Sequence, residues 1–174
     1  MNDRITPNPG STFRFRRWTA AMAVVGLLLG ASTAALAADE INLTNGHTAD
    51  GAPLALHGYD PVAFFSQGAP AVGNASHASV HRGATYYFAS KENKKTFERD
   101  PDRYVPAFGG FCAYGVSVGK KFDGNPRYWT IWKDRLYLNL NGEIARAFTA
   151  DVPGAVAKAE KQWRNIEHRP IAGL

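Results

Sequence analysis

One pattern occurs twice in this chain and constrains its fold more than any other feature. Each copy has a β-hairpin, a capped helix with an inward-facing aromatic residue, and an acidic residue shortly before a proline. Phe97 and Phe148 lie 51 positions apart, and so do Asp100 and Asp151. Self-similarity at a fixed spacing indicates repeated structural units, although common elements can also coincide. The pattern predicts a small single α+β domain with two hairpin-plus-helix halves related as a pseudo-repeat.

The local signals place the elements of each half. The first hairpin is expected over residues 79–89, and Ser90 is expected to cap the helix that follows. The second hairpin is expected over residues 128–139, with a turn at Lys133-Asp134, and its helix is expected to begin at Asn141-Gly142. One face of each hairpin must be buried, so most of the aromatic residues on these strands are predicted to be core.

Residues 1–37 have the organisation of a signal peptide. A positive segment that ends at Arg16-Arg17 precedes the uncharged apolar run Ala20–Gly30, and Ala35-Leu36-Ala37 has the A-x-A pattern of a cleavage site. A bilayer span takes about 20 apolar residues, which makes an uncleaved anchor the weaker alternative. We expect cleavage after Ala37 and a periplasmic or secreted protein. The Sec route is favoured over the twin-arginine route, because the residues after the arginine pair match the latter poorly.

The remaining chain is predicted to contain a flexible arm over residues 38–55, an α+β domain over residues 56–168 and a tail over residues 169–174. The full chain has 174 residues and a formal net charge of +5. Residues 1–37 hold four arginines and one acid, which leaves 16 basic and 14 acidic side chains elsewhere. This balance gives no reason to expect a nucleic-acid partner. No stable membrane insertion is expected once the signal peptide is removed.

Cys112 is the only cysteine, and it lies in the stretch Phe108–Gly115 between the two halves. It cannot form an internal disulfide. Three roles stay open for it: a buried inert thiol, a reactive nucleophile, or a ligand for a soft metal ion such as Cu(I), which prefers thiolate and imidazole. His57 is the expected partner for either chemical role, and Asp60 nearby is a further candidate metal ligand.

Four segments in order carry a resemblance to a known family. They are Gly58–Phe65, Tyr86–Ser90, the stretch from Phe97 through Asp100-Pro101 to Tyr104, and Gly109–Ala113. Together they resemble the YHS-domain family, and most closely its exported bacterial branch, the YHS domain-containing (seleno)proteins. The resemblance covers about residues 56–163. The name of this branch implies that some relatives contain selenocysteine, which we place at the position of Cys112.

The resemblance implies metal handling, because YHS domains also occur on heavy-metal-transporting ATPases. Those relatives carry three cysteines where this sequence has Ala63, Ala89 and Asn93. Their thiol ligands therefore cannot be carried over, and Cys112 remains as the main candidate. The leading expectation is an exported domain that binds a soft transition metal, copper first, through Cys112 with His57 and Asp60. A metal-transport or redox protein of the cell envelope would be its partner.

Two alternatives remain beside metal binding. One is a thiol-redox protein that uses Cys112 as its nucleophile, and the other is a non-catalytic structural or interaction module with a buried inert thiol. The sequence contains no His-Glu-x-x-His or phosphate-loop motif. It therefore gives no reason to expect a conventional enzyme.

Overall fold

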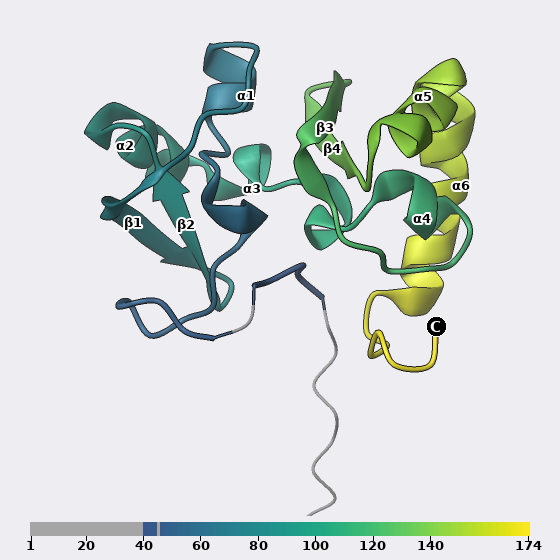
Figure 1. Cartoon of the computed structure of the whole chain (residues 1–174), viewed down its shortest axis with the longest axis horizontal. Helices are drawn as coiled ribbons and strands as arrows, with labels where there is room; N and C mark the ends of the chain where they lie inside the picture. Colours follow the sequence, from purple (N-terminus) through teal and green to yellow (C-terminus); the bar gives the residue numbers. More distant parts are fainter. Residues whose placement is uncertain (1–39, 45) are drawn as a thin grey trace, which may run out of the picture. The chain divides into compact units, whose positions relative to one another are not determined.

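The computed structural model describes residues 40–44 and 46–174, so the predicted signal peptide lies outside the described part. The described chain has an α+β fold, as the sequence predicted. Its first half contains η1 (Leu56–Gly58), α1 (Ala63–Ser66), β1 (Asn74–His81), β2 (Ala84–Phe88), α2 (Lys91–Arg99) and α3 (Pro101–Tyr104) (Figure 1). Its second half contains η2 (Ala107–Gly110), α4 (Ala113–Ser117), β3 (Asn125–Trp132), β4 (Arg135–Asn139), α5 (Gly142–Ala150) and α6 (Val152–Ile166). No helix among the described residues is both long and apolar enough to cross a bilayer.

Both sheets are antiparallel hairpins of two strands. In the first, Ala78 lies opposite Tyr87, and in the second, Trp129 lies opposite Leu138. Each hairpin also has one shift of register in the early part of its first strand, which indicates a β-bulge. The bulge lets a long strand of eight residues pair with a strand of five.

The hairpin turns explain how the strands reverse. Arg82 and Gly83 have φ values of 49° and 76°, and Lys133 and Asp134 have values of 47° and 57°. Positive φ at both central residues is the property of type I′ turns, whose twist matches that of the flanking strands. The turn predicted at Lys133-Asp134 is therefore confirmed.

Polar side chains cap the helices that follow the hairpins. Ser90 accepts a hydrogen bond from the backbone N–H of Asn93 at the start of α2, at 3.1 Å. Asn141 does the same for Ile144 at the start of α5, at 3.0 Å. Such caps satisfy backbone donors that a helix leaves unpaired and contribute about 1 kcal/mol each. Both predicted helix starts are confirmed.

The two halves have the same element order after their first turns. The strands β3 and β4 and the helix α5 each begin and end 51 positions after β1, β2 and α2. This agreement concerns the order and length of elements. A pseudo-repeat that relates the two halves stays a prediction.

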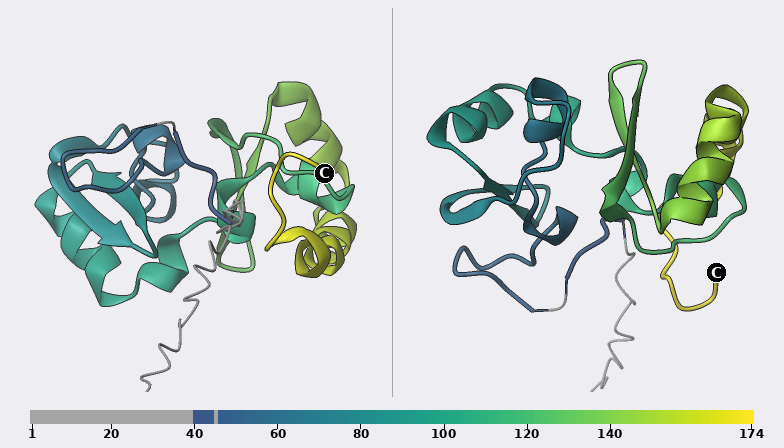
Figure 2. Two further views of the ribbon diagram at one scale, coloured as in Figure 1. Left: turned by 90° about the horizontal axis from the view of Figure 1, so that it is seen from below. Right: turned by 45° about the horizontal axis from the view of Figure 1, so that its top comes forward.

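The hydrophobic core consists of two clusters that share one strand. The first cluster includes Phe64, Phe88, Phe97, Leu136 and Leu138. The second includes Phe111, Tyr137, Phe148, Val156 and Ile166, and in this half α6 packs along α4 (Figure 2). Successive side chains of a strand point to opposite faces, so β4 gives its two leucines to one cluster and its tyrosine to the other. Each such side chain contributes about 1.5–3 kcal/mol when it is buried, and β4 links the two halves.

Candidate functional site

Cys112 lies between η2 and α4 and acts as the N-cap of α4. Its backbone N–H donates to the carbonyl of Phe122 at 2.9 Å. Its Sγ accepts from the N–H of Gly115 at 3.4 Å and donates to Oδ1 of Asn139 at 3.9 Å. Only 1% of the residue is exposed. The thiol is therefore enclosed and hydrogen-bonded in both directions.

The electrostatics around the thiol favour its protonated form. Burial raises the pKa of Cys112, because a thiolate loses hydration there. Backbone N–H groups of Gly115, Leu140 and Tyr114 partly oppose this effect, whereas the negative charge of Asp123 adds to it. The net pKa lies above the ordinary value. Since the thiolate is the form that attacks electrophiles and binds metals, this environment suppresses both chemistries.

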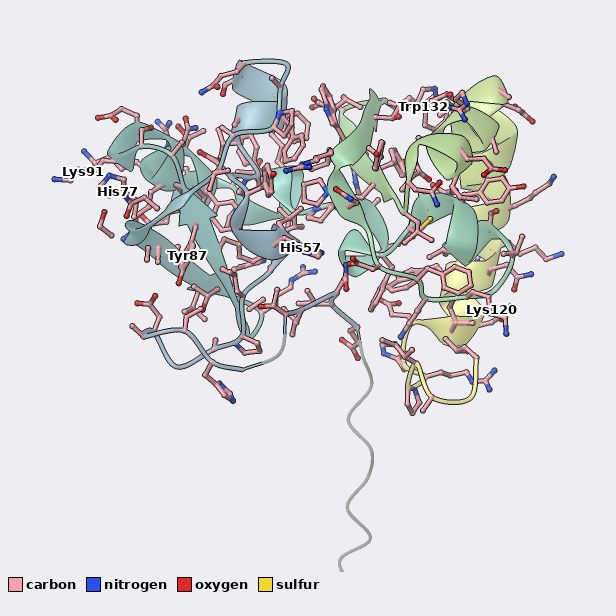
Figure 3. All side chains as sticks on the ribbon, in the orientation of Figure 1. His57, His77, Tyr87, Lys91, Lys120 and Trp132 are labelled. Atoms are coloured by element: carbon pink, nitrogen blue, oxygen red, sulfur yellow. The ribbon has the colours of Figure 1, made fainter. Side chains whose placement is uncertain are left out.

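His57 is held in η1 with φ at 51°, a left-handed conformation that is uncommon outside glycine. Figure 3 labels it beside the segment that precedes α1. Its Nε2 lies 2.8 Å from Oδ1 of Asp123, and both side chains are partly exposed. Asn42 donates to the same carboxylate oxygen at 2.7 Å. The structure thus pairs His57 with Asp123.

The neighbours of the Asp123 carboxylate lower its pKa. Partial burial acts to raise the pKa of Asp123, but hydrogen bonds from Asn42 and His57 outweigh it and hold that pKa below its ordinary value. Asp123 directly follows Phe122, the residue whose carbonyl binds the Cys112 N–H. His57 is therefore connected to the cysteine segment through Asp123.

Asp60 is fully buried, and each of its two carboxylate oxygens accepts two hydrogen bonds. Its Oδ1 accepts from the N–H groups of Val62 at 2.8 Å and Ala63 at 3.3 Å. Its Oδ2 accepts from the N–H of Ala89 at 2.8 Å and from Nδ2 of Asn93 at 2.6 Å. These bonds tie the start of α1 to the end of β2 and to α2. The role of this carboxylate is therefore structural.

The same contacts locate Ala63, Ala89 and Asn93, the three positions at which the sequence resemblance implies cysteines in other YHS domains. Ala63, Ala89 and Asn93 all donate to Asp60, so these three positions meet around one carboxylate. Two of them have no ligating side chain here. The amide of Asn93 is already engaged with Asp60. The arrangement thus stabilises the first half and does not fit a soft metal ion.

Asn139 is a site residue that sequence reasoning missed. It is fully buried at the end of β4, and its Oδ1 accepts from the N–H of Tyr114 at 3.3 Å as well as from the thiol. Its Nδ2 is the one buried side-chain polar atom of the described residues that lacks a hydrogen-bond partner. The only sequence signal was an asparagine in a strand pattern, which is unfavourable for a strand interior.

The candidate ligands do not assemble into a metal centre. Among residues 40–44 and 46–174, no three His, Cys, Asp or Glu side chains are grouped so that they could hold a metal ion. Cys112 is enclosed with an amide, His57 is paired with Asp123, and Asp60 is saturated by its own donors. A soft ion prefers several thiolate or imidazole ligands, and the residues around Cys112 do not supply them.

Comparison with known proteins identifies one family. Residues 71–108 match the family model of the YHS domain. No curated protein and no solved structure matches the chain. The matched residues include both strands of the first hairpin, α2 and α3, whereas His57, Asp60 and Cys112 lie outside them. Over residues 71–108 the chain is thus similar to the YHS domain.

Proposed function

We propose that this protein is a non-catalytic YHS-type binding module in which Cys112 has a structural role. The enclosure of the thiol carries this proposal, since Cys112 is 1% exposed and its Sγ is hydrogen-bonded on both sides. The thiol caps α4 and packs between η2 and β4. Nucleophilic chemistry would need both deprotonation and access for a substrate.

Alkylation kinetics test this role directly. The purified, reduced protein is treated with N-ethylmaleimide at pH 7.5, and the adduct at Cys112 is quantified by mass spectrometry. Labelling is expected to be slow in the native protein and to reach one adduct per chain when urea unfolds it. Free glutathione serves as the rate reference. Native labelling as fast as glutathione would contradict the structural role and favour the thiol-redox alternative.

Metal handling is the second candidate, because the YHS family is associated in general with it. The link from His57 through Asp123 to the Cys112 segment favours this candidate. In this proposal Cys112 and His57 would bind Cu(I) as thiolate and imidazole, after the thiol becomes accessible. Asp60 keeps its place as the hydrogen-bonded carboxylate of the first half. A metal-transport or redox protein of the envelope would then exchange the ion with this module.

A competition titration separates the two candidates. Cu(I) is titrated anaerobically against a chelator of known affinity, with the unmodified protein, Cys112→Ala and His57→Ala in parallel. Metal handling predicts one-to-one binding that is abolished in Cys112→Ala and weakened in His57→Ala, together with a metal-linked rise in Tm. The structural role predicts that all three proteins leave the chelator loaded.

Export completes the proposal. Cleavage after Ala37 and release into the periplasm would place the module where metal and redox partners of the envelope are found. The intact mass of the protein recovered from a periplasmic extract tests this. A chain that begins at Ala38 supports export, whereas an uncut chain in the membrane fraction would favour an anchor.

A further inference from the structure

A cavity of about 190 Å³ lies where parts of both halves meet. Arg82 and Tyr86 line it from the first hairpin, Phe108 from η2, Arg135 from β4 and Trp163 from α6. A second cavity of about 330 Å³ shares Phe108, Arg135 and Trp163 with the first. The two are therefore neighbours along one wall. Ligand sites commonly occur where separate structural units meet.

The apolar part of the cavity wall is aromatic and held in place. The rings of Phe108 and Trp163 have centroids 5.7 Å apart. Phe108 has φ at 55° and ψ at 37°, the left-handed conformation that a bulky residue rarely adopts. Such backbone strain of about 1–3 kcal/mol persists only where the surroundings enforce it, and it is frequent at ligand sites. A Cβ on the next residue, Gly109, would overlap the carbonyl oxygen of Glu40.

The polar part of the wall has donors without partners. Tyr86 is only 2% exposed, and burial raises its pKa to about 12, so its hydroxyl stays protonated. Across the described part of the chain, no hydrogen bond to this hydroxyl and no ion pair of Arg135 is present. By contrast, the guanidinium of Arg82 pairs with Asp102 at 3.0 Å. Tyr86 and Arg135 thus offer an unused hydroxyl and an unused guanidinium to the cavity.

The two acidic groups of the first cavity share one histidine. Glu40 lies 2.7 Å from Nδ1 of His168, and Glu167 lies 3.9 Å from Nε2 of the same ring. In the second cavity, Glu160 and Arg164 bring charges of opposite sign. Arg135 lines both cavities and is the arginine of the first cavity that has no ion pair among the described residues. An anionic ligand group would be attracted to it.

We propose that this cavity binds a small planar aromatic carboxylate. The carboxylate lies against the Arg135 guanidinium and the Tyr86 hydroxyl, and the ring lies against Phe108 and Trp163. Pockets for drug-sized ligands have volumes of about 300–1,000 Å³. The first cavity, at about 190 Å³, is smaller, which favours a ligand smaller than a drug molecule. The inference gives a ligand class to the proposed binding role and rests on it.

Benzoate is the probe, and ¹H–¹⁵N NMR of the labelled protein follows its binding. Saturable shifts are expected at the Gly109 amide and the Trp163 indole N–H. Benzamide, which has the same shape without the charge, should bind about tenfold more weakly or worse. Arg135→Gln should lower benzoate affinity by about tenfold or more, and Tyr86→Phe by about threefold to tenfold, as expected for charged and neutral hydrogen bonds. Arg146→Gln, an exposed arginine outside both cavities, should leave affinity unchanged.

Three outcomes would overturn the proposal: no saturation with benzoate, equal affinity for benzamide, or equal affinity in Arg135→Gln and Arg146→Gln. Arg135 is exposed, so its replacement should leave the fold intact, and the dispersion of the NMR spectrum verifies this. Arg135→Lys retains the charge and should restore part of the affinity. Failure here leaves the alkylation result for Cys112 unaffected, so the two proposals fail separately.

Discussion

Asn139 accepts a hydrogen bond from the Cys112 thiol at an Sγ to Oδ1 distance of 3.9 Å, inside the core and 27 positions along the chain. The same oxygen accepts from the N–H of Tyr114. The cysteine segment is thereby attached to the last residue of β4, the strand that both hydrophobic clusters share. This contact makes the lone cysteine part of the packing.

Replacement of Cys112 by alanine is expected to destabilise the protein by about 1–3 kcal/mol. The change removes a small buried side chain and the acceptor of the Gly115 N–H. Urea unfolding at pH 7 measures it. Cys112→Ser serves as the control, because its hydroxyl oxygen can replace the sulfur as acceptor of the Gly115 N–H. Benzoate binding should be the same in both variants. A loss of benzoate binding in a folded Cys112→Ala protein would show that the thiol does more than pack.

Alkaline pH should weaken the protein through the same thiol. The pKa of Cys112 is raised in the folded state, so its contribution is fully present below the ordinary thiol pKa of about 8.5 and is lost as pH rises through the folded value. The free energy of unfolding, measured under reducing conditions between about pH 8 and 10, should fall more in the unmodified protein than in Cys112→Ala. Comparison with Cys112→Ala isolates the thiol, because every other titrating group is common to the two proteins. Parallel curves for the two proteins would contradict the prediction.

Asp60→Ala is expected to cost about 3 kcal/mol or more, because it leaves four donors near α1, β2 and α2 without their acceptor. Asn93→Ala removes one of these donors and should cost less. Thermal unfolding compares the two variants with the unmodified protein. An Asp60→Ala protein as stable as Asn93→Ala would show that the carboxylate does not organise this half.

Acid pH should weaken the protein through Asp123. Its pKa is lowered in the folded state, so its contribution is present above the ordinary aspartate pKa of about 3.9 and is lost as pH falls through the folded value. Tm measured between about pH 2 and 5 should therefore drop less steeply in Asp123→Asn than in the unmodified protein. Identical slopes of Tm against pH in the two proteins would show that Asp123 does not contribute to the acid sensitivity.

Lys121 should stabilise the C-terminal end of α6. It is 4% exposed, and its Nζ donates to the carbonyls of Glu167 and Arg169 at 2.8 and 2.7 Å. A cation at a helix C-terminus also interacts favourably with the helix dipole. Lys121→Met keeps the apolar stem and should destabilise by about 1–3 kcal/mol in urea. Lys120→Met is the matched control, since Lys120 is exposed (labelled in Figure 3), and it should have little effect.

Local sequence signals determined the secondary structure of both halves. The strand patterns, the Lys133-Asp134 turn and the caps Ser90 and Asn141 act through neighbouring backbone groups. Such interactions depend on residues a few positions apart, so they can be read without the tertiary structure. The α+β class followed from them, and the match of residues 71–108 to the YHS domain agrees with the resemblance seen in the sequence.

Only the tertiary structure decided what surrounds each candidate site residue. Asn139 meets Cys112 across 27 positions, Asp123 meets His57 across 66, and Asn93 meets Asp60 across 33. No local rule predicts such pairs, because each depends on how β4, η1 and α2 pack. Burial then raises the pKa of the Cys112 thiol and removes its access to solvent. The sequence by itself identified the cysteine, and three-dimensional packing made it a part of the core.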